Sequence, residues 1–107
     1  MQMSQDCYYS HLCVDPDLRE LVQLFIDELP DRLLQLQQSL EDRDYSELAR
    51  FAHQLKGAGG SYGFPQLTPA AAQLEHLARE ATDDVALRLA LDELVEVTGR
   101  LRAGLPE

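Results

Sequence analysis

His53 is the residue of this 107-residue chain whose type and surroundings are best suited to chemistry. On a helical wheel that starts at Leu48, with about 100° per residue, His53 falls at about 140°, away from the apolar face and toward solvent. A neutral imidazole nitrogen is a competent nucleophile, and an unperturbed imidazole, with a pKa of about 6.5, is largely neutral at near-neutral pH. We therefore expect His53 to be exposed and able to attack an electrophile delivered by another molecule.

Small residues surround His53 along its helix. Ala49 precedes it by one turn, and Gly57 and Gly60 follow it on the same side. Glycine inside a helix costs up to about 1 kcal/mol relative to alanine, so this stretch requires a reason. One reason is access, because a bare surface lets another protein reach the imidazole. The alternative is that the glycines mark the end of the helix, with Gly59 or Gly60 as its C-terminal cap.

The local charge around His53 differs from that of the whole chain. The chain has 19 acidic and 9 basic residues, a formal charge of -10, which disfavours binding to nucleic acid or to an anionic membrane surface. Arg50 and Lys56, however, lie one turn to either side of His53, and no acidic residue occurs between Glu47 and Glu75. This pattern predicts a local positive field, which suits an anion that arrives at the imidazole or forms on it.

Four amphipathic helices are predicted to position these residues. The first begins at Asp15-Pro16, a capping carboxylate followed by proline, and runs to near Glu41. Pro30 lies inside it, where its missing N–H leaves the carbonyl of Ile26 without a helical partner. Because the apolar stripe continues in register on both sides, we expect a kink at Pro30 rather than a break.

The other three helices follow after short connections. The second begins at Asp44 and ends among the glycines of 57–63. The third begins at Thr68, a capping hydroxyl followed by proline, and the fourth is capped within 82–84 and ends at 104–106. Together they predict an all-α fold, an antiparallel up-down-up-down four-helix bundle.

The whole chain, 1–107, is expected to be one domain, with a short N-terminal segment (1–14) and a helical bundle (15–103). We expect a monomer, because four helices already bury one another's apolar faces. Neither a secretion signal nor a membrane-spanning run is recognisable, so we expect a cytoplasmic location. Cys7, His11 and Cys13 lie close together near the N-terminus, but a fourth metal ligand at recognisable spacing is missing, and no role is assigned to them.

The region from His53 to Glu75 resembles the histidine-containing phosphotransfer (HPt) domain of two-component phosphorelays. The residues that carry this resemblance are the run His53-Gln54-Leu55-Lys56-Gly57, followed by Gly60, Gly63, Leu67 and Leu74-Glu75. The four-helix pattern extends it from Asp15 to Leu101.

The resemblance implies a role for each site residue. His53 would accept a phosphoryl group on Nε2 from the phospho-aspartate of a receiver domain, and would pass it to another receiver. Lys56 would steady the phosphoryl oxygens, and Glu75 would engage the other ring nitrogen and fix the Nδ1–H tautomer. Gly57 would clear space for the partner's loops.

The partner-binding surface is predicted to lie across the second and third helices. Its expected members are Ala49, Arg50, Gly57, Gly60 and Tyr62.

The resemblance also implies the partners: response-regulator receiver domains and an upstream hybrid histidine kinase. No nucleotide site is recognisable, so we expect a phosphotransfer intermediate rather than an enzyme. No cofactor of its own is expected, because Mg²⁺ would come with the receiver. Two alternatives remain: a helical adaptor that binds a response regulator without being phosphorylated, and a phosphotransfer domain cut from a larger sensor kinase.

Overall fold

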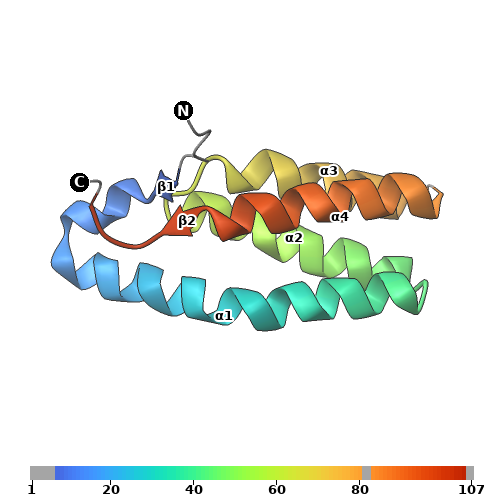
Figure 1. Ribbon diagram of the computed structural model, residues 1–107, viewed down its shortest axis with the longest axis horizontal. Helices are drawn as coiled ribbons and strands as arrows, with labels where there is room; N and C mark the ends of the chain where they lie inside the picture. Colours follow the sequence, from blue (N-terminus) through green and yellow to red (C-terminus); the bar gives the residue numbers. More distant parts are fainter. Residues whose placement is uncertain (1–6, 81–82, 106–107) are drawn as a thin grey trace, which may run out of the picture.

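A computed structural model describes residues 7–80 and 83–105. Its four helices are α1 (Pro16–Glu41), α2 (Tyr45–Ser61), α3 (Leu67–Arg79) and α4 (Asp84–Gly99). Successive helices run in opposite directions, and α4 lies beside α1, which closes the bundle (Figure 1). The predicted antiparallel up-down-up-down arrangement is confirmed.

Three of the four predicted helix starts are confirmed by their caps. The side chains of Asp15, Asp44 and Asp83 each accept a backbone N–H from the first turn of their helix, at 2.9, 3.1 and 2.9 Å. Such a bond satisfies one of the N–H groups that a helix start leaves without a partner. Thr82, also predicted at the last of these starts, lies outside the described residues.

The predicted cap of the third helix is wrong. The α3 helix begins at Leu67 with Gln66 at the cap position, two residues earlier than predicted, and it has no side-chain cap bond. The hydroxyl of Thr68 instead donates to the backbone carbonyl of Lys56 on α2, at 3.1 Å. Thr68 is therefore the second residue of α3 rather than its cap, and its hydroxyl makes a tertiary contact.

The predicted end of the fourth helix is also wrong. The α4 helix stops at Gly99, and the chain continues as β2 (Leu101–Arg102), a two-residue strand parallel to β1 (Tyr8–Tyr9). Leu101 is buried, and it reaches the core from this strand. The pairing ties the N-terminal segment, which also forms the 3₁₀ helix η1 (His11–Val14), to the end of the bundle.

Pro30 does not break α1, in agreement with the continuous apolar stripe. Side chains from all four helices meet in the core, and the stacked rings of Phe25 and Tyr62, with centroids 4.5 Å apart, join α1 to the end of α2. Each fully buried leucine contributes about 2 kcal/mol relative to exposure. The fully buried leucines of the four helices are Leu36, Leu48, Leu55, Leu67, Leu74, Leu87, Leu91 and Leu94.

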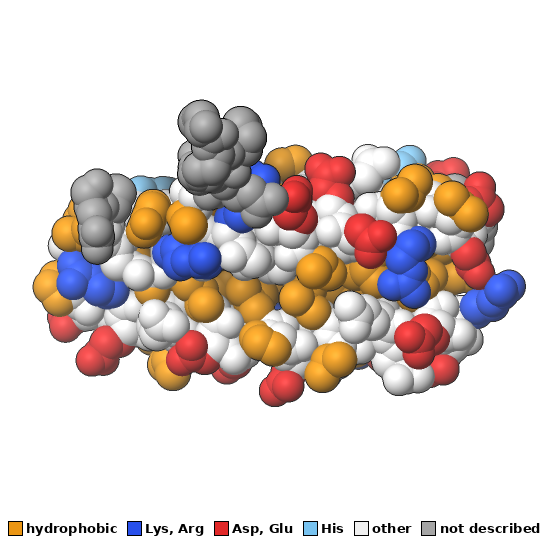
Figure 2. Space-filling view, viewed as in Figure 1, with side chains coloured by type: hydrophobic (Ala, Val, Ile, Leu, Met, Phe, Trp, Pro, Cys, Tyr) orange, Lys and Arg blue, Asp and Glu red, His pale blue; other side chains and the backbone are white. Residues whose placement is uncertain are grey.

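The face formed by α1 and α4 carries a seam of hydrophobic side chains with acidic side chains scattered around it (Figure 2). A shallow groove of about 350 Å³ follows this seam and is lined by Pro30, Val95 and Gly99, among others. None of the helices in the described part of the chain is long and apolar enough to cross a membrane. His53 and Glu75 lie on the other two helices, α2 and α3.

Candidate functional site

His53 lies on the outer surface of α2, as the helical wheel predicted. Its side chain is 60% exposed. Gly57 and Gly60 are exposed beside it, and a Cβ added at either position would meet no atom within 4 Å. Internal packing therefore does not require glycine at these two positions, and the surface next to the imidazole is open.

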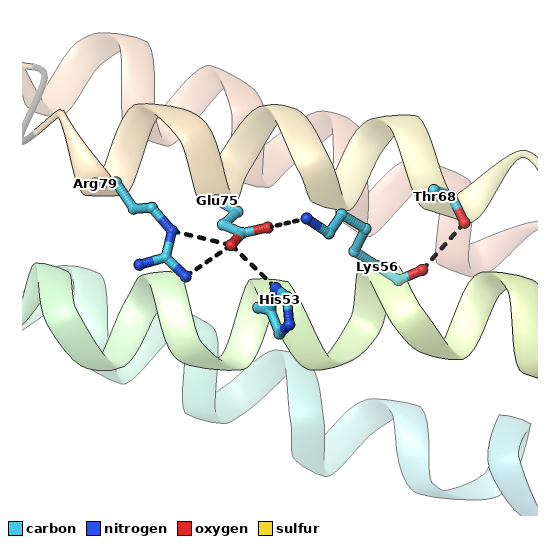
Figure 3. Close-up of polar contacts among 5 residues, drawn as sticks. All are labelled: His53, Lys56, Thr68, Glu75 and Arg79. Carbon is cyan, nitrogen blue, oxygen red and sulfur yellow. Dashed lines mark hydrogen bonds and ion pairs between the residues drawn. The ribbon is translucent and has the colours of Figure 1, made fainter.

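Glu75 reaches His53 from α3. Its side chain is only 9% exposed, and its Oε2 lies 3.0 Å from the Nδ1 of His53 (Figure 3). Because an ionised carboxylate can only accept hydrogen bonds, the proton must lie on Nδ1. The Nε2 of the neutral imidazole then keeps its lone pair, and this contact is the one expected for Glu75.

Two cations share the same carboxylate. The Nζ of Lys56 lies 2.7 Å from Oε1, and the Nε and Nη2 of Arg79 donate to Oε2 at 2.9 and 2.7 Å (Figure 3). The hydrogen bond from Lys56 is the largest cause of a lowered pKa of Glu75, about 2 instead of 4.5. Bonds from Arg79 and His53 act in the same direction, against the effect of burial.

The cluster of His53, Lys56, Glu75 and Arg79 has a net charge of +1 when the imidazole is neutral. Arg79 supplies half of its positive charge and was missed by sequence reasoning. The available signal was its spacing, since a residue four positions after Glu75 on a helix lies beside it.

Arg50 does not supply the positive field predicted for it. Its guanidinium donates to both carboxylate oxygens of Glu47, at 2.7 and 2.9 Å, and lies over the ring of Phe51. The prediction is corrected: Glu47 neutralises Arg50, and the net positive charge beside His53 comes from Lys56 and Arg79. Arg50 remains exposed at the surface, so its part in partner binding stays a prediction.

Ala49 is also corrected as a surface residue. It is 2% exposed and lies at the floor of a shallow hollow bordered by Tyr45, Ser46, Ala78 and Arg79. The packing of α3 against α2 covers it, so only a side chain that enters this hollow could touch it. Tyr62 is half-buried against Phe25, whereas Gly57 and Gly60 are exposed.

Within the described ranges, no group of three or more His, Cys, Asp or Glu side chains is placed to hold a metal ion. Cys7 is half-buried, Cys13 is buried, and both are free thiols. Among the described residues, His53 is the exposed nucleophile that lies within a cluster of close-packed polar groups.

Comparisons with known proteins identify the family of the chain. No curated protein and no solved structure matches the sequence. The family described as "Hpt domain" matches residues 20–104, a range that holds nearly all of the four helices and every residue of the site. This match confirms the resemblance and supports a phosphotransfer role in two-component signalling. The chain belongs to the Hpt domain family.

Proposed function

We propose that the protein is a phosphorelay carrier that accepts a phosphoryl group on Nε2 of His53 and passes it to another receiver domain. The observation that carries this proposal is the contact between His53 Nδ1 and an ionised, nearly buried carboxylate. It fixes one nitrogen of the ring as a donor and leaves the other nucleophilic on an exposed side chain.

The transfer would proceed from a receiver's aspartyl phosphate. The lone pair of Nε2 forms the N–P bond as the bond between phosphorus and the aspartyl oxygen breaks, and the aspartate leaves as a carboxylate. The ring becomes a phosphorylated imidazolium, and Glu75 stabilises its positive charge through the Nδ1–H bond. Reversal of the same step on a second receiver regenerates neutral His53.

Lys56 supports the proposal through its remaining hydrogen-bond donors. An ammonium group has three N–H donors, and the contact with Glu75 Oε1 at 2.7 Å engages one of them. The others are available to phosphoryl oxygens without loss of that ion pair. Arg79 keeps the cluster positive, because Lys56 and Glu75 alone would cancel.

The distribution of charge favours docking at α2 and α3. These two helices carry Glu47 and Glu75 as their only acidic residues, whereas α1 and α4 carry most of the negative charge. A receiver's phosphorylation site is itself acidic, so repulsion disfavours its approach to the other face. The acidic residues of α1 and α4 are Asp17, Glu20, Asp27, Glu28, Asp31, Glu41, Asp84, Asp92, Glu93 and Glu96.

We further propose that the receiver contacts Gly57, Gly60 and Tyr62 beside His53. Leu21 and Leu24, which are 52% and 59% exposed on α1, lie within one turn of Phe25, whose ring stacks on Tyr62. They would add an apolar margin that the sequence did not reveal. Such a small surface suits a transient encounter.

The expected partners are receiver domains and an upstream hybrid histidine kinase, in the cytoplasm. Mg²⁺ would come with the receiver, and the chain would act as substrate and carrier rather than as an enzyme.

The test uses a receiver domain charged with acetyl phosphate and Mg²⁺, mixed with the protein or with His53→Gln. Intact mass reports the gain of one phosphoryl group. We expect an acid-labile gain in the native protein and none in the variant. No gain from several receivers, with the fold confirmed by circular dichroism, would instead favour an adaptor that is not phosphorylated.

A further inference from the structure

Lys56 is held at both ends by α3. Its Nζ contacts Glu75 Oε1 at 2.7 Å, and its backbone carbonyl accepts a hydrogen bond from the hydroxyl of Thr68 at 3.1 Å (Figure 3). Thr68 and Glu75 are seven residues apart, two turns of α3, and therefore lie on the same face of that helix. The two contacts join α3 to α2, one through the side chain of Lys56 and the other through its backbone.

Thr68 packs tightly against Gly59 of α2. Gly59 is buried, and a Cβ added there would overlap the Oγ1 of Thr68 and lie 3.0 Å from its backbone N and 3.1 Å from the carbonyl of Phe64. Gly57 and Gly60, in contrast, have open space at the same position. Gly59 is therefore required by the approach of α3, and the hydroxyl of Thr68 lies directly over it.

Thr68 is not the cap of α3. It is the second residue of the helix, which begins at Leu67 without any side-chain cap bond. Its hydroxyl donates across to α2, so the hydrogen bond that it makes lies between the helices.

We propose that Thr68 is a positioning residue for His53: with Gly59, it sets the spacing of α2 and α3 that keeps Glu75 within reach of His53 Nδ1 and Lys56 Nζ. The importance of Thr68 for phosphotransfer rests on the proposed function, whereas its effect on the spacing of the helices does not. A hydrogen bond of 3.0 Å between side chains on two helices weakens as the helices separate. Loss of the Thr68 bond therefore frees the imidazole to change tautomer and orientation.

The experiment compares variants that remove or keep the hydroxyl. Thr68→Val preserves the volume of the side chain, Thr68→Ala adds no atom near Gly59, and Thr68→Ser keeps the hydroxyl. Thr98→Val is the matched control, because the Thr98 hydroxyl also donates to a backbone carbonyl, that of Val95 at 2.8 Å, but within α4 rather than between helices. Nitrogen-15 NMR of the imidazole reports the His53 tautomer, and intact mass reports the rate of phosphorylation by a charged receiver.

We expect Thr68→Val and Thr68→Ala to reduce the fraction of the Nδ1–H tautomer and to slow phosphorylation about tenfold. Thr68→Ser should restore both, and Thr98→Val should lower thermal stability while leaving both unchanged. A native tautomer in the two hydroxyl-free variants, or the same loss in Thr98→Val, would overturn the inference. If the native protein is not phosphorylated, the proposed function fails, but the tautomer comparison still decides the role of Thr68.

Discussion

The Nδ1 of His53 and the Oε2 of Glu75 lie 3.0 Å apart across the interface of α2 and α3, although 22 residues separate them along the chain. The contact makes the two nitrogens of the imidazole different. One is bonded to a nearly buried carboxylate, while the other belongs to a side chain that is 60% exposed. An ordinary surface histidine has no such distinction, which here depends on Glu75 and on the groups that hold its carboxylate in place.

Replacement of Glu75 with glutamine should flatten the acid dependence of stability. Hydrogen bonds from Lys56, Arg79 and His53 lower the pKa of Glu75 to about 2. A pKa lowered in the folded state stabilises the fold above the unfolded value of about 4.5, and this contribution is lost as the pH falls toward 2. Because Lys56 and Arg79 are partly exposed, we expect the native protein to lose only about 1–2 kcal/mol of unfolding free energy from this source as the pH falls.

Urea unfolding of the native protein and of Glu75→Gln, at several pH values between about 5 and 2, measures this difference. The native protein should lose more stability than the variant over that range. Parallel curves for the two proteins would show that the carboxylate is not stabilised by its neighbours.

Replacement of Gly57 with leucine should block transfer and leave the fold intact. A Cβ at this position meets nothing within 4 Å, so the new side chain projects from the surface beside His53. Gly57→Ala is the control, and it should raise the unfolding free energy by up to about 1 kcal/mol through helix propensity. Normal transfer to Gly57→Leu would show that access to the imidazole does not depend on this glycine.

Replacement of Gly59 with alanine should have the opposite effect on stability. Its Cβ would overlap Thr68 Oγ1, so we expect a loss of about 1–3 kcal/mol in unfolding free energy from overpacking. Gly60→Ala adds the same methyl group to open space one residue later and should stabilise. Thermal denaturation of the two variants measures the contrast, and equal changes would contradict the close approach of the helices.

Replacement of Lys56 with alanine should slow phosphotransfer or shorten the lifetime of the phosphoryl group. The variant removes the donors proposed for the phosphoryl oxygens. Arg50→Ala is the control on the same helix. Because Arg50 is already paired with Glu47, this variant should leave the lifetime unchanged. Phosphoprotein decay followed by intact mass measures the lifetime, and no effect of Lys56→Ala on either quantity would remove its proposed role.

Local signals in the sequence predicted most of the fold. The caps at Asp15, Asp44 and Asp83 depend on residues within one turn, and the apolar stripes of the helices depend on a fixed period. Thr68 was misassigned because α3 begins two residues before the start that its local signal indicates, and because its hydroxyl contacts another helix, which local sequence does not specify. The two-residue strands were missed because they are too short to show a pattern. Their pairing also joins Tyr8 to Leu101, across nearly the whole chain.

The site was predictable to the extent that one helix contains it. His53, Lys56 and the open glycines follow from the periodicity of α2, whereas Glu75 required the family resemblance. The pairs Arg79–Glu75 and Arg50–Glu47 each lie within one helix, at spacings of four and three residues, and were overlooked although the sequence contains them. The burial of Ala49 depends on how α2 and α3 are rotated against each other, and no spacing within a single helix determines that rotation.

The position of the phosphoryl group on the ring tests the central claim most directly. The protein would be phosphorylated by a charged receiver, with nitrogen-15 in its histidines, and examined by phosphorus and nitrogen NMR. We predict one phosphohistidine, at His53, with phosphorus on Nε2 and the proton on Nδ1. Phosphorus on Nδ1, or an equal signal from His53→Gln, would contradict the assignment of the two nitrogens and of Glu75 as the group that distinguishes them.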